Sequence, residues 1–270
     1  MSDLKLYGTG RRKRSVARVF LKLGSGKIMI NGKNYKDYLC RDSLGTIVSQ
    51  PLALLEIEDS YDIDIVLNCV GLTNVEDCEH NPSEAFKLNS QLPGIIANAC
   101  KSTNTKLIHI STDHLFDDQN ILYSEEDEVK LINVYATSKY EGELEVLNNC
   151  QASIICRTNF FGYGPAHKNS FSQWIEESAK NNQKIVLFKD VFFTPVSGAN
   201  LAFYAHKLLE NNFYGIFNIS SDKKISKFEF GKLLCDKLNI PSYSIFPGSI
   251  DDRSDLVRRP KSMGLSNAKL

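Results

Sequence analysis

The sequence predicts an α/β protein in which a doubly wound parallel sheet is preceded by a small basic β-rich segment. Two observations lead to this prediction. From about residue 64 onward, short apolar runs alternate with helix-like segments of ten or more residues, which is typical of βαβ units around a parallel sheet. Residues 1–41, by contrast, hold eleven Lys and Arg against two Asp, although the whole chain has a net charge of zero. We therefore divide the chain into segments 1–60 and 61–270.

Composition and cysteine usage narrow the class of protein. A hydrophobic content of 42% and a charged content of 24% are ordinary for a globular domain. The seven cysteines are scattered and lack a CxxC pair, so we expect reduced thiols in the cytoplasm, with neither disulfides nor a zinc site. The five histidines show no ligand spacing, so no metal is expected. No apolar run has the length of a membrane span or the position of a signal peptide, so no membrane association is expected.

Short strands are predicted at the N-terminus. KLY, SVARVFLKL and KIMI carry β-type patterns, with GSG at 24–26 as a tight turn and NGKNYKDYL leading into a possible helix. Two phosphate-binding patterns are rejected here. Gly8-Thr9-Gly10 is followed by Lys13 where a dinucleotide-binding turn needs its third glycine. GSGK lacks both the earlier glycine and the following Ser or Thr of a phosphate loop, because Leu21 and Ile28 stand there.

Segment 61–270 supplies the elements of the parallel sheet. IDIVLNCV (63–70), TKLIHIST (105–112) and ASIICRT (152–158) are apolar runs typical of strands buried on both faces. A helix begins at Asn81-Pro82 and extends to about residue 102, and we expect Pro93 to kink or split it. VYATSKYEGELEVLNN is a strongly amphipathic helix. The remaining predicted elements are helix 171–180, strand 184–188, helix 198–211, strand 215–220 and helix 226–238.

One constellation in this segment carries chemistry. Tyr135 and Lys139 stand four residues apart on the predicted helix, so they share one face. A free tyrosine has a pKa of ~10, and a nearby ammonium lowers that pKa, so Tyr135 is expected to protonate a substrate carbonyl. Thr112 ends a predicted strand at the edge where parallel sheets bind ligands. Taken alone, a Tyr and a Lys four residues apart are usually just a solvated helix face, and Thr112 alone is typical of a helix cap or a turn.

These motifs resemble the extended short-chain dehydrogenase/reductase superfamily, and more narrowly the dTDP-4-dehydrorhamnose reductases. The matching stretches are NCVGLTNVEDCEHNPSEAFKLN, STDHLFD, YATSKYEGE, RTNFFGYG, FFTPVSGANLA and RRPKSMGLSNAKL, and the likeness covers about 205 residues. The resemblance implies reduction of the C4 keto group of a nucleotide-linked 4-keto-6-deoxy sugar, with NADPH or NADH as the hydride donor.

The resemblance also assigns roles to residues. The catalytic residues would be Thr112, Tyr135 and Lys139; the cofactor would be lined by Val70, Gly71, Leu72 and Lys139; and the substrate would be contacted by Asp113, Asn159 and Phe160. Lys139 would hold the nicotinamide ribose and tune Tyr135. Asn89 is a further candidate for the cofactor site.

The chain departs from this family pattern in two respects. It lacks the GxxGxxG turn with which the fold normally begins, where a helix N-terminus receives the pyrophosphate. We therefore expect an incomplete doubly wound parallel (Rossmann-like) sheet and weak or absent reductase activity. Leu72, Phe160 and Val196 also replace the family's Tyr, Trp and Thr, so the sugar and the nicotinamide cofactor stay open. A non-catalytic sugar-nucleotide-binding remnant is an alternative.

The N-terminal segment resembles a different family. YGTGRRKRSVARVFLKLGSGKIMINGKNYKDYL is similar to the opening of bacterial small-subunit ribosomal protein S-nine, and the likeness extends through residues 41–56. This second resemblance implies a structural protein that binds ribosomal RNA through residues 1–41. The RNA phosphates would be neutralised by Arg11, Arg12, Lys13, Arg14 and Arg18. The chain thus resembles a chimera joined between about residues 45 and 66, and its oligomeric state stays open.

Overall fold

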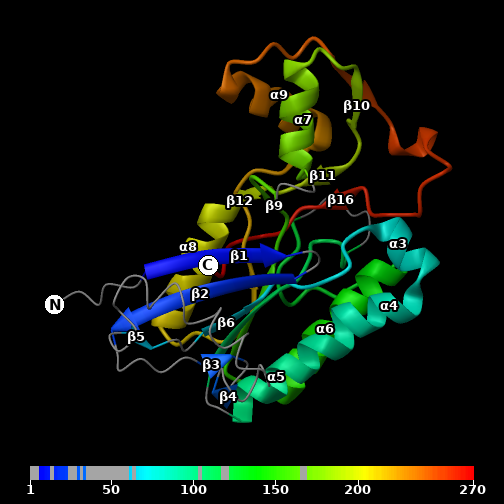
Figure 1. The fold of residues 1–270 in the computed structure, drawn as a ribbon. Coiled ribbons are helices and arrows are strands. Elements are labelled where there is room, and N and C mark those ends of the chain that lie inside the picture. The colour runs from blue at the N-terminus through cyan, green and yellow to red at the C-terminus, as the bar shows by residue number, and fades with distance from the viewer. Residues whose placement is uncertain are drawn as a thin grey trace.

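The computed structural model describes residues 6–12, 15–23, 29–30, 33–34, 61–62, 65–102, 105–116, 122–164 and 169–270. The chain has a mixed α/β fold with a parallel sheet, as the sequence predicts, and a smaller group of helices and strands lies beyond one end of that sheet (Figure 1). Lys13, Arg14 and the predicted turn at 24–26 lie outside the described residues.

The main sheet has four parallel strands. They are β6 (Ile65–Asn68), β7 (Lys106–Ile110), β8 (Ser153–Arg157) and β13 (Gly215–Asn218), and they pair in the order β13-β8-β7-β6. Every residue of β8 is buried, as expected for an inner strand with helices on both sides. The three apolar runs predicted as strands are therefore neighbours, and their carboxyl ends lie at the same edge of the sheet.

Helices cover both faces of the sheet. Those that pack on it are α5 (Leu92–Ser102), α6 (Val134–Asn149) and α8 (Gly198–Glu210). On one face, Ile96 of α5 and Val146 of α6 share an apolar cluster with Leu107 of β7. On the other face, Leu201 of α8 shares a cluster with Ile108 of β7. Figure 1 shows α8 on the opposite side of the strands from α5 and α6, which is the doubly wound arrangement.

The helical stretch before β7 is divided, as its proline predicts. Its parts are α3 (Val75–His80), α4 (Pro82–Phe86), the π-helical turn η1 (Lys87–Gln91) and α5. Pro82 occupies the first position of α4, where its missing N–H costs nothing. Pro93 is the second residue of α5 and comes directly after the π-helical turn. Because proline has no backbone N–H to donate, the regular α-helical hydrogen bonding changes at this point.

The second, smaller group of elements corrects one prediction. Its members are β9 (Phe160–Phe161), α7 (Phe171–Lys180), β10 (Ile185–Phe188), β11 (Phe192–Phe193), β12 (Val196–Ser197), β14 (Ile225–Ser226), α9 (Lys227–Leu238), β15 (Ile245–Gly248), the 3-10 turn η2 (Ile250–Asp252) and β16 (Ser262–Met263). The strand predicted at 184–188 was expected in the doubly wound sheet. It is instead β10, which pairs in parallel with β15 in a separate two-stranded sheet. The physical reason is that Ile185 and Leu187 pack into a separate apolar cluster with Ile175 of α7 and Phe230 of α9.

The N-terminal strands form a hairpin. β1 (Leu6–Arg12) pairs antiparallel with β2 (Ser15–Leu23), β2 also pairs with β5 (Tyr61–Asp62), and β3 (Met29–Ile30) pairs with β4 (Lys33–Asn34). Gly8 and Gly10 lie inside β1 and not at a strand-to-helix turn, which agrees with rejecting them as a dinucleotide-binding site. Lys33 and Asn34, at the start of the predicted helical stretch, are in a strand. β2 contacts β6, the terminal strand of the parallel sheet.

Candidate active site

The structure brings the predicted site residues to one edge of the parallel sheet. Val70, Gly71 and Leu72 follow β6, Thr112 and Asp113 follow β7, and Asn159 and Phe160 follow β8. Since β6, β7 and β8 are adjacent and parallel, these three groups lie side by side at the carboxyl ends of their strands. This is the edge at which open α/β sheets bind their ligands.

Helix α6 presents Tyr135 and Lys139 to this edge. The Asn133 side chain caps the helix by accepting a hydrogen bond from the backbone N–H of Ala136 at 2.8 Å. Tyr135 is 8% exposed and Lys139 is 4% exposed, so neither belongs to a solvated helix face. The Lys139 Nζ donates a hydrogen bond to the backbone carbonyl of Ile110, the last residue of β7, at 2.6 Å. The helix is thereby joined to the strand that carries Thr112.

Tyr135 lies in a setting that keeps its hydroxyl protonated. Burial raises the pKa of Tyr135 above its usual value of 10, while a hydrogen bond with Thr112 acts to lower that pKa. The edge of the His114 ring meets Tyr135 with 5.4 Å between ring centroids, and the His114 backbone N–H donates to the Thr112 hydroxyl at 3.2 Å. The spacing of Tyr135 and Lys139 in the sequence predicts that Lys139 lowers this pKa. The structure instead directs the Lys139 ammonium to the Ile110 carbonyl, and burial dominates.

Asp113 and Asn159 meet directly. The Asn159 amide Nδ2 donates to Asp113 Oδ2 at 2.7 Å. Asp113 is 1% exposed, and burial raises its pKa to about 6, although Lys227 and the Asn159 hydrogen bond act to lower it. Phe160, by contrast, is exposed on β9, the short strand that pairs with β12. Two of the three residues predicted for the substrate are therefore in contact with each other.

Sequence reasoning missed Lys227. It is the first residue of α9, and its Nζ lies 3.3 Å from the centroid of the Phe193 ring. Burial lowers the pKa of Lys227 to about 8, the charge of Asp113 acts to raise it, and Arg259 acts to lower it further. Lys227, which belongs to the smaller group of elements, thus interacts electrostatically with Asp113, the residue that follows Thr112. No local motif marks Lys227, because its role depends on how the two parts of the chain pack.

Asn89 organises the loop predicted for the cofactor. Its Oδ1 accepts a hydrogen bond from the Leu72 backbone N–H at 2.8 Å, and its Nδ2 donates to the Leu72 carbonyl at 3.0 Å. The same amide lies 3.0 Å from the Ser138 hydroxyl on α6, to which it donates. A Cβ placed on Gly71 would come within 2.8 Å of the Asn89 oxygen, so this close approach needs glycine. Asn89 thus holds the loop against α6, next to Lys139.

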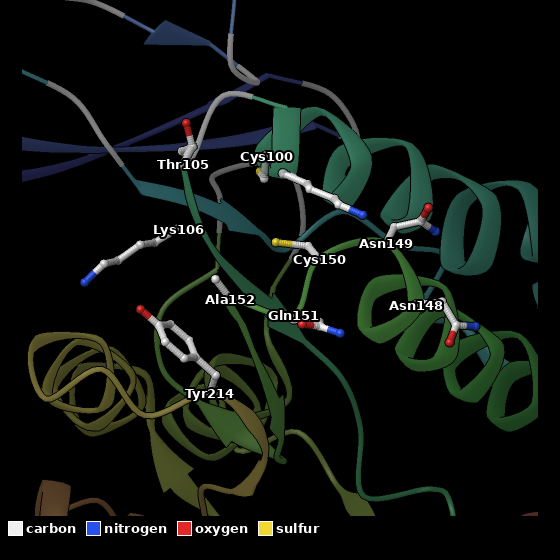
Figure 2. Close-up of a pocket in the computed structure, with 10 residues that line it drawn as sticks. Cys100, Thr105, Lys106, Asn148, Asn149, Cys150, Gln151, Ala152 and Tyr214 are labelled. Carbon is white, nitrogen blue, oxygen red and sulfur yellow. The ribbon is translucent and has the colours of Figure 1, made fainter.

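A pocket lies at the opposite edge of the sheet. It has a volume of about 510 Å³ and is lined by residues that include Cys100, Lys106, Cys150 and Tyr214 (Figure 2). Lys106 begins β7 and Cys150 follows α6, so this pocket opens at the amino ends of the strands, away from Thr112. None of the residues predicted for catalysis, cofactor or substrate lines it. The candidate site therefore lies at the carboxyl edge of the sheet and does not include this pocket.

Within the described ranges, no group of three or more His, Cys, Asp and Glu side chains is arranged to hold a metal ion. Among the helices of those same ranges, none combines the length and apolar character needed to span a bilayer. The six cysteines in the described part of the chain are not joined in disulfides.

Comparison with known proteins identifies the family to which the chain is similar. A sequence model of the RmlD substrate binding domain matches residues 37–270. A probable low-salt glycan biosynthesis reductase from Haloferax volcanii is 31% identical over 213 residues, covering 77% of this chain and 71% of that protein. A dTDP-4-dehydrorhamnose reductase from Aggregatibacter actinomycetemcomitans is 26% identical over 287 residues, covering all of this chain and 92% of that protein. The family match begins at residue 37, inside the segment predicted to be ribosomal in origin.

A solved structure shows the same fold. The dTDP-4-dehydrorhamnose reductase from Bacillus anthracis, crystallised in complex with NADP, superposes with a TM-score of 0.70 at 26% identity, covering 83% of this chain and 75% of that one. These relatives support a nucleotide-sugar enzyme lineage and give no support to ribosomal RNA as a partner. The likeness to ribosomal protein S-nine therefore stays a prediction.

Proposed function

The chain belongs to the RmlD substrate binding domain family, and from this premise we propose that it is a sugar-nucleotide reductase of the dTDP-4-dehydrorhamnose type. Its reaction would reduce the C4 keto group of a nucleotide-linked 4-keto-6-deoxy sugar. The observation that carries the proposal is the convergence of Thr112, Tyr135 and Lys139 at the carboxyl end of β7. A buried, protonated tyrosine beside a threonine hydroxyl suits proton delivery to a carbonyl oxygen.

Each residue has a definable task in this proposal. Tyr135 donates its hydroxyl proton to the C4 oxygen as that oxygen gains charge, because burial keeps the proton on the phenol until a stronger base forms. Thr112 contributes a hydrogen bond to the same oxygen. Lys139 holds a positive charge nearby, which favours the phenolate that remains. Asp113 and Asn159, already hydrogen-bonded to each other, supply polar contacts for the hydroxyl groups of the sugar.

The cofactor would be NADPH or NADH, which supplies the hydride. The residues present fit the nicotinamide half of this cofactor. Val70, Gly71 and Leu72 are half-buried at the end of β6, and Asn89 holds their loop against the helix that carries Lys139. They suit the nicotinamide end. No glycine-rich turn precedes β6 in the described residues to receive the pyrophosphate, so weak cofactor binding is expected.

The first test is a titration of the purified chain with NADPH, in which binding is measured from the fluorescence of the cofactor. We expect weak binding, with a Kd nearer ~1 mM than ~1 μM, together with slow reduction of a dTDP-4-keto-6-deoxy sugar. Tyr135→Phe should reduce that turnover by about 10²–10⁴-fold, because the proton donor is lost. Tyr140→Phe, on the same helix, is the matched control and should retain turnover. Equal turnover in Tyr135→Phe and wild-type protein would contradict the proposal.

A non-catalytic sugar-nucleotide-binding protein is the second candidate. It is favoured by the absence of a GxxGxxG turn in the sequence and by the Lys139 ammonium, which is held by a backbone carbonyl. A methionine adenosyltransferase 2 subunit beta from Pongo abelii is 28% identical over 238 residues, so relatives of this chain include subunits of other enzymes. A folded chain that binds dTDP-sugar but shows no NADPH binding up to ~10 mM would favour this second candidate.

A further inference from the structure

A buried carboxylate joins three elements of the candidate site. Glu143 is 0% exposed and lies on α6, one helical turn after Lys139. The Arg157 guanidinium donates to it, with its Nε 3.1 Å from each carboxylate oxygen and its Nη2 2.8 Å from Oε2. The Ser111 hydroxyl donates to Oε1 at 2.5 Å. A carboxylate that accepts several charge-assisted bonds inside a protein is held in one position.

The partners of Glu143 lie at the carboxyl ends of the two inner strands, with Ser111 directly after β7 and Arg157 as the last residue of β8. Ser111 immediately precedes Thr112, and Arg157 lies two positions before Asn159. The Arg157 side chain is itself buried, at 2% exposure, and its Nη1 donates to the Glu125 carbonyl at 3.4 Å. Glu143 therefore connects the helix that carries Tyr135 to the strand ends that carry Thr112 and Asn159.

Glu143 also acts on the charge of Lys139. Burial lowers the pKa of Lys139 to about 8, while the charge of Glu143, and then that of Cys69, act to raise it. His109 of β7 also faces Lys139, but burial lowers the pKa of His109 far below neutrality, so this histidine adds no positive charge. Tyr135, on the same helix face, is kept neutral by burial. Among the charged groups that favour the ammonium form of Lys139, the carboxylate of Glu143 therefore has the largest effect.

We propose that Glu143 is a positioning residue for the candidate active site, whose carboxylate supports the positive charge of Lys139 one helical turn away and holds Ser111, and with it Thr112, against α6. The inference rests on the proposed function for the use made of the Lys139 charge. It goes beyond that function because it assigns a task to a buried ion pair to which the proposed reaction gives none.

The test is a direct titration of Lys139 by NMR of the side-chain Nζ in ¹⁵N-lysine-labelled protein, with the signal assigned from Lys139→Arg. The wild-type midpoint is expected at about 8. Glu143→Gln should lower the midpoint by about one pH unit or more, because the opposite charge that acts most to raise it is removed. Glu141→Gln, an exposed carboxylate on the same helix, should leave it unchanged. An unchanged midpoint in folded Glu143→Gln would overturn the proposal.

A second variant protects the test against a folding failure. Glu143→Gln leaves the buried Arg157 guanidinium without its anion, which is costly. The double variant Glu143→Leu with Arg157→Met removes both charges, so it avoids an unpaired buried ion. It should still lower the Lys139 midpoint, by less than Glu143→Gln does because the positive charge of Arg157 is removed as well, and an unchanged midpoint in both folded variants would overturn the proposal. The titration needs no cofactor or substrate, so a lack of NADPH binding would count against the proposed function and not against this inference.

Discussion

The buried position of Asp113 disfavours the charged form of its carboxyl group. Burial raises its pKa to about 6 from the usual 3.8, against the lowering effects of Lys227 and Asn159. Between these two pH values the folded protein binds more protons than the unfolded chain. The contribution of Asp113 to stability is therefore full below pH ~4 and is lost as the pH rises through about 6. Asp113→Asn should raise the free energy of unfolding at pH 7 by up to about 3 kcal/mol, with little change at pH 4.

Urea unfolding at pH 4 and pH 7 would measure this difference. The Asn side chain keeps an oxygen that can accept the Asn159 hydrogen bond, so the contact is retained while the charge is removed. Asp236→Asn, at an exposed carboxylate on α9, is the control and should change stability by the same small amount at both pH values. If Asp113→Asn changed the free energy of unfolding equally at pH 4 and pH 7, the prediction that burial raises the pKa of Asp113 would be wrong.

At the scale of elements, the contact between α6 and the π-helical turn requires a glycine. A Cβ on Gly142 would lie 2.0 Å from the backbone oxygen of Asn89, which cannot move as a side-chain end can. Gly142→Ala should therefore destabilise the protein by about 1–3 kcal/mol through overpacking, although alanine has the better helix propensity by about 1 kcal/mol. It should also weaken NADPH binding, because Asn89 holds the Leu72 loop.

Gly94→Ala on α5 is the matched control. Its Cβ would meet only the Glu145 side chain, the carboxylate oxygen at 2.8 Å and the Cβ at 3.1 Å, and no backbone atom. We expect Gly94→Ala to stay within about 1 kcal/mol of wild type, because helix propensity compensates for a small side-chain shift. Thermal or urea denaturation of the two variants would compare them. Equal destabilisation by both would mean that the α6 contact tolerates a methyl group after all.

At the scale of the whole molecule, the chain combines two regions of opposite charge. Residues 1–41 hold eleven basic and two acidic residues, whereas the remainder holds 21 basic and 30 acidic. Arg11, Arg12 and Arg18 lie on the β1–β2 hairpin. If this hairpin binds RNA, replacing all three with Gln should reduce the slope of log affinity against log salt concentration by about 2–3, since each phosphate contact contributes ~0.7–0.9. Filter binding with ribosomal RNA at several salt concentrations would measure it, and an unchanged slope would exclude these arginines.

The sequence by itself determined helix α6, the strands of the parallel sheet and the shared helix face of Tyr135 and Lys139. α6 extends over Val134–Asn149, the stretch that the periodicity predicts, and the strands β6, β7 and β8 lie within the predicted apolar runs. Such features depend on residues close together in the chain, where propensity and i, i+4 spacing are visible. The placement of Thr112 at the sheet edge also follows from βαβ order, because parallel strands end on one side.

Only the tertiary structure decided the partner of β10, the approach of Lys227 to Asp113 and the burial of Glu143 with Arg157 and Ser111. It also decided that burial raises the pKa of Tyr135, whereas the sequence pattern alone indicated that Lys139 would lower it. The physical reason is common to all four. Strand partners, charge coupling and desolvation depend on which distant groups pack around a side chain, and no local pattern encodes that packing.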